Sequence, residues 1–159
     1  MTSLDAMNGD FRDMVLALCA AKADFVIVGA YAVAYHGHPR ATGDFDILTR
    51  PSTENSARVW QALLAFGAPV QALGIRLEDL RNPDVVCQIG QPPRRIDLLT
   101  SISGVDFDTA WRSRVDVPWR GCSVAFLGRD ALLANKRASG RPKDLEDVRH
   151  LERRNPPRA

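Results

Sequence analysis

The chain has 159 residues, of which 45% are hydrophobic and 25% charged, and its formal net charge is +2. This length and balance are typical of one globular domain with its own core, and they argue against intrinsic disorder. No apolar run approaches the roughly 20 residues of a transmembrane helix, and acidic residues precede the short apolar segment 15–21, so we expect neither a membrane span nor a signal peptide.

The cysteines indicate a reducing compartment. Cys19, Cys87 and Cys122 are odd in number, and no two of them have CxxC spacing. This pattern argues against a disulfide framework and against a zinc site. We therefore expect a cytoplasmic protein.

Charge is distributed unevenly along the chain. Residues 1–111 carry nine Lys or Arg and thirteen Asp or Glu, whereas residues 112–159 carry twelve and six. An acidic front half and a basic back half can fold together around a metal ion and a polyphosphate. A solvated basic tail explains the same distribution, and charge alone favours it.

The first half of the chain is predicted to alternate helices with short buried strands. Helices are predicted from the helical spacing of apolar residues, and strands from β-branched runs. Helices are expected to end at Gly67 and at the glycine and proline within 36–39. Ser52 is a predicted N-cap, with Asn55 three residues later. In chain order we expect a helix over 11–22, a strand over 25–28, a helix over 30–35, a strand over 44–48 and a helix from 52 to about 66.

The second half is predicted to contain two strand pairs and two final helices, while residues 68–83 fit no single element. The expected strands are 85–89 and 95–99, which form an antiparallel pair, and 113–117 and 123–127; the expected helices are 129–139 and 142–153. The prediction is one α/β (α+β) domain over residues 1–153, with a small mixed β-sheet flanked by helices. Residues 154–159 are expected to be a flexible C-terminal tail.

The most informative segment is 43–48. Side chains alternate along a strand, so Asp44 and Asp46 share one face while Phe45 and Ile47 point to the core. Neighbouring carboxylates repel each other unless a cation lies between them, and Mg²⁺ takes hard oxygen ligands and bridges to phosphates. Two solvated aspartates on an exposed strand are the alternative, which a short Asp-x-Asp pattern favours when it stands alone.

The residues around this pair add to the interpretation. The first predicted strand ends at Gly29 and Ala30, where a helix opens, and such a junction presents free N–H groups to phosphate. Arg40 and Thr42 lie just upstream of the acids and can contact phosphate or orient the loop. A third acid, Asp97, faces away from the aliphatic residues on either side of it.

Together these residues resemble the nucleotidyltransferase superfamily. Its pattern of a hydrophobic strand, two small residues, a spacer and Asp-hydrophobic-Asp is matched by residues 26–30 and 44–46, with Asp97 as the later strand acid. A closer resemblance, to bacterial nucleotidyltransferase-like domains related to AbiEii-type toxins, is carried by 36–42, Lys136 and 140–148. We therefore expect the nucleotidyltransferase fold.

The resemblance implies roles for individual residues. Asp44, Asp46 and Asp97 would be catalytic and would hold Mg²⁺ or Mn²⁺, and Asp97 would also help to deprotonate the attacking hydroxyl. Position 30 departs from the family, which commonly has Gly or Ser there. The expected nucleotide-binding residues are Gly29, Ala30, Arg40, Thr42, Lys136, Lys143, Asp144 and Asp147.

Lys136 projects from the apolar stripe of its predicted helix. It can bind phosphate as the resemblance implies, or it can pair with a carboxylate such as Asp147. His36 and His38 are expected in a loop near the pocket mouth rather than as ligands, because Mg²⁺ prefers oxygen.

The implied reaction transfers a nucleoside monophosphate from ATP, GTP or another NTP to an acceptor hydroxyl. The acceptor can be an RNA or tRNA end, a protein side chain or a small molecule. A cognate antitoxin or toxin is a further expected partner, and no binding to a membrane is expected. One alternative is an NTP-binding or antitoxin-like module whose catalysis is weakened, with Ala30 marking the loss. Another is an antibiotic nucleotidyltransferase.

Overall fold

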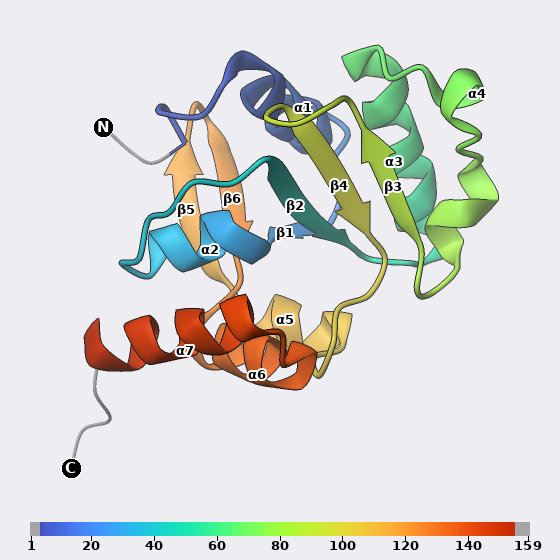
Figure 1. Cartoon of the computed structure of the whole chain (residues 1–159). Helices are drawn as coiled ribbons and strands as arrows, with labels where there is room; N and C mark the ends of the chain where they lie inside the picture. The colour runs from blue at the N-terminus through green and yellow to red at the C-terminus, as the bar shows by residue number, and fades with distance from the viewer. Residues whose placement is uncertain (1–3, 155–159) are drawn as a thin grey trace.

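The computed structural model describes residues 4–154 as a mixed sheet between two layers of helices (Figure 1). The strands are β1 (Phe25–Ile27), β2 (Asp44–Thr49), β3 (Val86–Ile89), β4 (Arg95–Leu99), β5 (Val115–Trp119) and β6 (Cys122–Phe126). The helices are α1 (Gly9–Ala20), α2 (Gly29–Tyr35), α3 (Thr53–Phe66), α4 (Val70–Leu73), α5 (Phe107–Arg112), α6 (Arg129–Ser139) and α7 (Pro142–Arg154), with a 3-10 helix η1 (Leu77–Arg81). The predicted α+β class is confirmed.

The strands follow the order β3-β4-β2-β1-β6-β5 across the sheet. Two pairs of neighbours, β2 with β4 and β1 with β6, are parallel, and the other neighbours are antiparallel. The predicted antiparallel pairing of β3 with β4 is confirmed. Because β2 and β4 are parallel neighbours, Asp46 lies directly opposite Asp97.

Each face of the sheet has its own hydrophobic core. Alternation along β1 sends Phe25 and Ile27 to one face and Val26 to the other. On the first face they join buried residues of α1 and α3, among them Phe11, Leu18, Val59 and Leu63. On the second face the helices α2, α5, α6 and α7 supply residues that include Val33, Ala110, Leu132 and Leu151. The second layer of helices lies on the face of the sheet that carries the acids.

Local capping explains where several helices begin and end. The predicted N-cap is confirmed, since the Ser52 hydroxyl accepts a hydrogen bond from the Asn55 N–H at 3.1 Å. Helix α1 begins at Gly9, two residues earlier than predicted, because the Asn8 side chain caps it. The sequence analysis missed α5, although Asp106 accepts a hydrogen bond from Thr109 N–H at 2.7 Å and starts it.

The expectation that the cysteines form no disulfide is wrong. Cys19, near the end of α1, and Cys122, at the start of β6, form a disulfide with their Cα atoms 6.2 Å apart, whereas Cys87 is a buried free thiol. The two partners are 103 positions apart in the chain. They meet because α1 packs beside β6, a tertiary contact that the spacing of cysteines does not encode.

Two further predictions concern the ends of the chain and the membrane. Helix α7 continues through Arg154, and the rest of the predicted tail, 155–159, lies outside the described residues. Within residues 4–154, every helix falls short of the length and apolar character that crossing a bilayer requires.

Candidate functional site

Three carboxylates from neighbouring strands form the centre of the candidate site. Asp44 and Asp46 extend from the same face of β2, and Asp97 extends from β4 beside them, while Phe45 is buried in the core as predicted. One carboxylate oxygen from each acid lies within 4.8 Å of the others. A compact set of hard oxygen donors of this kind fits Mg²⁺ or Mn²⁺.

Arg95, which the sequence analysis did not single out, bridges two of these acids. Its Nε donates to Asp97 Oδ1 at 2.9 Å, and its Nη2 donates to Asp44 Oδ2 at 2.9 Å and to Asp97 Oδ2 at 3.1 Å. The hydrogen bond to Asp97 and the charges of both acids raise the pKa of Arg95. Its position two residues before Asp97, on the same strand face, was the signal in the sequence.

Asp46 has a different environment from its two neighbours. Among residues 4–154, no side chain or backbone N–H donates a hydrogen bond to its carboxylate, and only its main-chain oxygen is used, by the Val28 N–H at 3.1 Å. Burial, followed by the charges of Asp44 and Asp97, raises the pKa of Asp46 to about 7, against a partial offset from Lys136 and Arg95. The site therefore holds more negative charge than its own cations balance.

The junction of β1 and α2 lies directly against this acid. Gly29 has a φ of +65°, and a Cβ at this position would collide with Asp46 Oδ2. Glycine is therefore required both for the backbone conformation and for the close approach. Ala30, the next residue, is buried and lines the same cavity as the acids.

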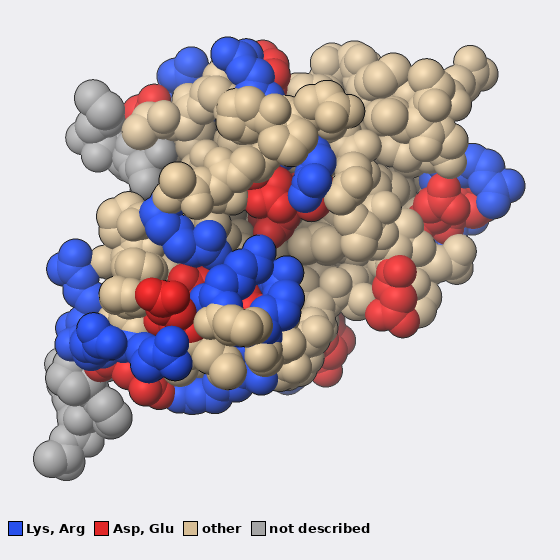
Figure 2. All heavy atoms as spheres, viewed as in Figure 1, with Lys and Arg blue, Asp and Glu red and all other residues tan. Residues whose placement is uncertain are grey.

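A cavity of about 640 Å³ lies over the three carboxylates. One wall is formed by the strands and their acids, and the opposite wall by the region where α6 ends and α7 begins. This second wall includes Asn135, Lys136, Ser139, Arg141, Lys143 and Asp144. Figure 2 shows acidic atoms in the hollow of this face and basic atoms gathered along its lower border, over α6 and α7. The acidic front half and the basic back half of the sequence do face each other here.

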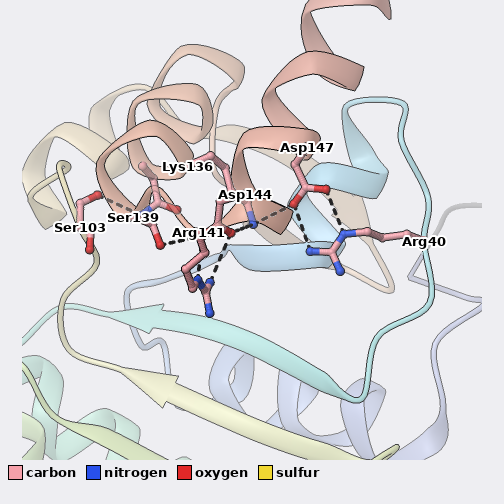
Figure 3. A network of polar contacts seen from close by, with 8 residues as sticks. Arg40, Ser103, Lys136, Ser139, Arg141, Asp144 and Asp147 are labelled. Carbon is pink, nitrogen blue, oxygen red and sulfur yellow. Dashed lines mark hydrogen bonds and ion pairs between the residues drawn. The ribbon is translucent and has the colours of Figure 1, made fainter.

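At the second wall, five charged residues form a continuous chain of ion pairs, which we call the helix network (Figure 3). Its members, in spatial order, are Arg40, Asp147, Lys136, Asp144 and Arg141. Lys136 Nζ lies 3.1 Å from Asp147 Oδ2 and 3.2 Å from Asp144 Oδ1. Arg40 binds both oxygens of Asp147 at 3.1 Å. Positive and negative groups alternate from end to end, so each acid lies between two cations.

The middle of the network is buried and its ends are accessible. The side chains of Lys136, Asp144 and Asp147 are at most 5% exposed, whereas that of Arg141 is 60% exposed. Burial alone would raise the pKa of Asp144, but hydrogen bonds from Arg141, Ser139 and Lys136 hold that pKa well below its usual range. The network thus fixes α7 against α6.

Arg141 connects the network to the acids across the cavity. Its guanidinium binds Asp144 at 2.7 Å and points from the helices toward the strands in Figure 3. The hydrogen bond to Asp144 contributes most to the raised pKa of Arg141, and the charges of Asp46 and Asp44 add to it. The pKa of Arg141 therefore depends both on Asp144 in the helix network and on the acids of β2. Arg141 was not among the site residues predicted from the sequence.

Most of the expected site residues lie together, although not all of them face the cavity. The residues expected at the site that line the cavity are Gly29, Ala30, Arg40, Thr42, Asp44, Asp46, Asp97, Lys136, Lys143 and Asp144. Asp147 is not among the described residues that line the cavity, and it forms ion pairs with Arg40 and Lys136. Thr42 orients Asp44, since its hydroxyl donates to Asp44 Oδ1 at 2.8 Å. For Lys136, the pairing with carboxylates that the sequence left open is present, and a role toward phosphate stays a prediction.

The two histidines of the loop after α2 make contacts elsewhere. His36 Nε2 lies 2.8 Å from the Leu127 carbonyl oxygen, and the His38 ring stacks on His150 with centroids 3.9 Å apart. Both rings lie outside the set of described residues that line the cavity.

Comparison with models of known protein families gave no match for this chain, and comparison with curated proteins gave none either. The resemblance to nucleotidyltransferases therefore depends on the sequence motifs quoted above, and it stays a prediction.

Proposed function

We propose that this chain is a metal-dependent nucleotidyltransferase that moves a nucleoside monophosphate from an NTP to an acceptor hydroxyl. The observation that supports it best is the set of three carboxylates within 4.8 Å on one wall of a cavity whose opposite wall is basic. A metal–triphosphate complex has the charge distribution that matches both walls, because its cation faces the acids and its phosphates face the bases.

Each wall has a separate task in this proposal. Asp44, Asp46 and Asp97 would hold Mg²⁺ or Mn²⁺, which would supply positive charge to offset the negative charge of the α-phosphate and of the departing pyrophosphate. From the opposite wall, Arg141 and Lys143 bind the outer phosphates, since both side chains are exposed to the cavity.

The transfer is an in-line displacement at phosphorus. The acceptor oxygen forms a bond to the α-phosphorus, and the bond from this phosphorus to the β-bridging oxygen breaks, so that pyrophosphate leaves with the electron pair. The hydroxyl proton passes to Asp97, the role that the family resemblance assigns to the third acid. Gly29 keeps the space beside Asp46 open, because any larger residue would collide with that carboxylate.

The acceptor that we propose is an RNA end. Exposed basic side chains surround the cavity mouth on the side of α6 and α7 (Figure 2). Of these residues Arg141 and Lys143 line the cavity, and Arg137, Arg149, Arg153 and Arg154 are further exposed basic residues of α6 and α7. Such a surface attracts a phosphate backbone by charge, independently of sequence. The Cys19–Cys122 disulfide removes the argument from the cysteines for a reducing compartment, and we place the reaction in the cytoplasm because NTPs and RNA are both present there.

The test is a labelling experiment with matched protein variants. The purified protein is incubated with each α-³²P-labelled NTP, Mg²⁺ and total RNA or cell protein, next to the Asp46→Asn variant. We expect label on RNA with the wild type and at least about a 10³-fold lower rate with Asp46→Asn. Label on protein would mean that the acceptor is a protein side chain and not RNA, while the proposed reaction would stand.

Two results would contradict the proposal. Equal labelling by the wild type and Asp46→Asn would place the chemistry outside this site. NTP binding by the wild type without any transfer would support the alternative of a binding module, in which Ala30 marks lost catalysis.

A further inference from the structure

Arg95 donates to three of the four carboxylate oxygens of the two acids that it bridges. Both oxygens of Asp97 and one of Asp44 accept from its guanidinium, at 2.9 to 3.1 Å. The other oxygen of Asp44 accepts from Thr42 at 2.8 Å. In this state one positive charge, that of Arg95, is shared by Asp44 and Asp97.

One atom of Arg95 lies at the point where the two strands' acids converge. Its Nη2 is within hydrogen-bond distance of both Asp44 and Asp97, so this nitrogen lies between acids from β2 and β4. A divalent cation that binds the same two carboxylates needs the lone pairs that now face Nη2, and its charge repels the guanidinium. The cation and this conformation of Arg95 therefore exclude each other.

Arg95 also has space to move and a group to move to. Its side chain is 28% exposed, and it lines the cavity that would contain the triphosphate. A guanidinium pairs with phosphate oxygens through two parallel hydrogen bonds, the same geometry that it uses here on Asp97.

The geometry points to an exchange of partners: Arg95 occupies the cation position between Asp44 and Asp97 in the metal-free protein, and it transfers to the nucleotide's phosphates when the cation binds. The exchange rests on the proposed function, because it assumes a metal–NTP complex at these acids. Its consequence for the reaction is that Arg95 Nε no longer donates to Asp97 Oδ1, and this oxygen becomes free to accept the hydroxyl proton.

The decisive experiment measures Mn²⁺ binding without nucleotide, by electron paramagnetic resonance of the free ion, in the wild type and in Arg95→Gln. The matched control is Arg94→Gln, since Arg94 is the neighbouring residue, is 63% exposed and, within residues 4–154, forms an ion pair only with Asp10, at 3.6 Å. We expect Arg95→Gln to bind Mn²⁺ about tenfold more tightly than the wild type, because breaking charge-assisted hydrogen bonds no longer opposes binding. Arg94→Gln should bind Mn²⁺ like the wild type.

A second measurement uses a non-reactive α,β-imido ATP in the presence of Mg²⁺. Arg95→Gln should bind this analogue about tenfold more weakly, because the guanidinium that pairs with phosphate is absent. Arg94→Gln should again bind it like the wild type. Tighter Mn²⁺ binding together with weaker analogue binding is the combination that the exchange predicts and that a purely structural role for Arg95 does not.

The outcomes separate this inference from the proposed function. If the wild type binds Mn²⁺ and Arg95→Gln binds it equally or more weakly, Arg95 is a positioning residue for Asp97 and the exchange is wrong, while the metal site stands. If neither the wild type nor either variant binds Mn²⁺ at millimolar concentration, the proposed metal site itself is wrong, and the exchange is wrong with it.

If Arg95→Gln does not fold, the wild type still provides a test. The ¹⁵N-labelled Nε–H resonance of Arg95, assigned by its loss in Arg95→Lys, should shift when Mg²⁺ is added, whereas that of Arg40 in the helix network should not. If the chemical shift of the Arg95 resonance does not change at saturating Mg²⁺, the proposed exchange is wrong.

Discussion

Two clusters of charged residues face the same cavity, and they differ in how their charges are balanced. In the helix network, cations and acids alternate from Arg40 to Arg141, and each acid is bound by at least two donors. On the strands, three acids share one cation, Arg95, and Asp46 receives no side-chain hydrogen bond from any residue in 4–154.

The difference shows that hydrogen-bonding partners, and not burial alone, decide whether the pKa of an acid in these clusters is lowered or raised. Asp144 is completely buried, yet its pKa is lowered, because three side chains donate to it. Asp46 is partly exposed and has no hydrogen-bond donor on its carboxylate among residues 4–154, so burial, followed by the charges of Asp44 and Asp97, raises its pKa to about 7. In the helix network every acid has cationic partners within the protein, whereas the strand acids leave the Asp46 carboxylate without a donor among residues 4–154, and the proposed cation would compensate this charge.

The largest effect on stability is expected in the helix network. Lys136→Met should lower the free energy of unfolding by about 3–5 kcal/mol, because it leaves two buried carboxylates without the cation between them. Lys143→Met, at an exposed position of the same cavity, should change it by less than about 0.5 kcal/mol. Urea denaturation of both variants compares the two positions, and a loss below about 1 kcal/mol for Lys136→Met would mean that the network is not structural.

The strand acids should instead respond to ligand. Mg²⁺ and an NTP together should raise the melting temperature by more than the sum of their separate shifts, with a coupling free energy of about 1–3 kcal/mol, because each completes the other's coordination. Thermal unfolding over a concentration series measures this coupling in the wild type and in Asp46→Asn. Additive shifts in the wild type, or the same coupling in the variant, would argue against a shared site.

The smallest effect is a gain of stability on removing one acid. In EDTA at pH 8, Asp46→Asn should be as stable as the wild type or up to about 1–2 kcal/mol more stable, because repulsion among the acids is reduced. A carboxylate whose folded pKa is raised destabilises the fold above that pKa, and protonation relieves the cost as the pH falls. The gain should therefore be largest above pH 7 and shrink from about pH 7 toward pH 4, the range between the folded pKa of Asp46 and the ordinary value of about 4.

Unfolding curves across that pH range check the sign. A variant that is clearly less stable than the wild type at pH 8 would mean that Asp46 is a structural partner of Lys136 or Arg95, and the comparison of the two clusters would fail.

Features that depend on local rules were predictable from the sequence. The alternation of Asp44, Phe45 and Asp46 on one strand and the cap at Ser52 follow from neighbouring residues alone. The place of Asp97 beside them came from a resemblance to known motifs, and the parallel pairing of β2 with β4 is consistent with it.

Features that depend on tertiary packing were not predictable. Arg95 reaches Asp44 only because β2 and β4 pair in one register, which no local pattern specifies. Cys19 meets Cys122 only because α1 packs beside β6. The short helix α5 has a clear cap at Asp106, but one turn of apolar spacing was too little to distinguish it from a loop.

The parallel pairing of β2 with β4 also has a consequence for folding. Parallel neighbours cannot be joined by a tight turn, so the chain passes through α3, α4, η1 and β3 before β4 aligns, and Asp44 and Arg95 meet across 51 positions. Closing such a long segment costs chain entropy that only the assembled sheet repays, so the three carboxylates converge late. In the unfolded chain these acids are scattered, so the free energy of binding the proposed cation to the folded protein would add to its stability.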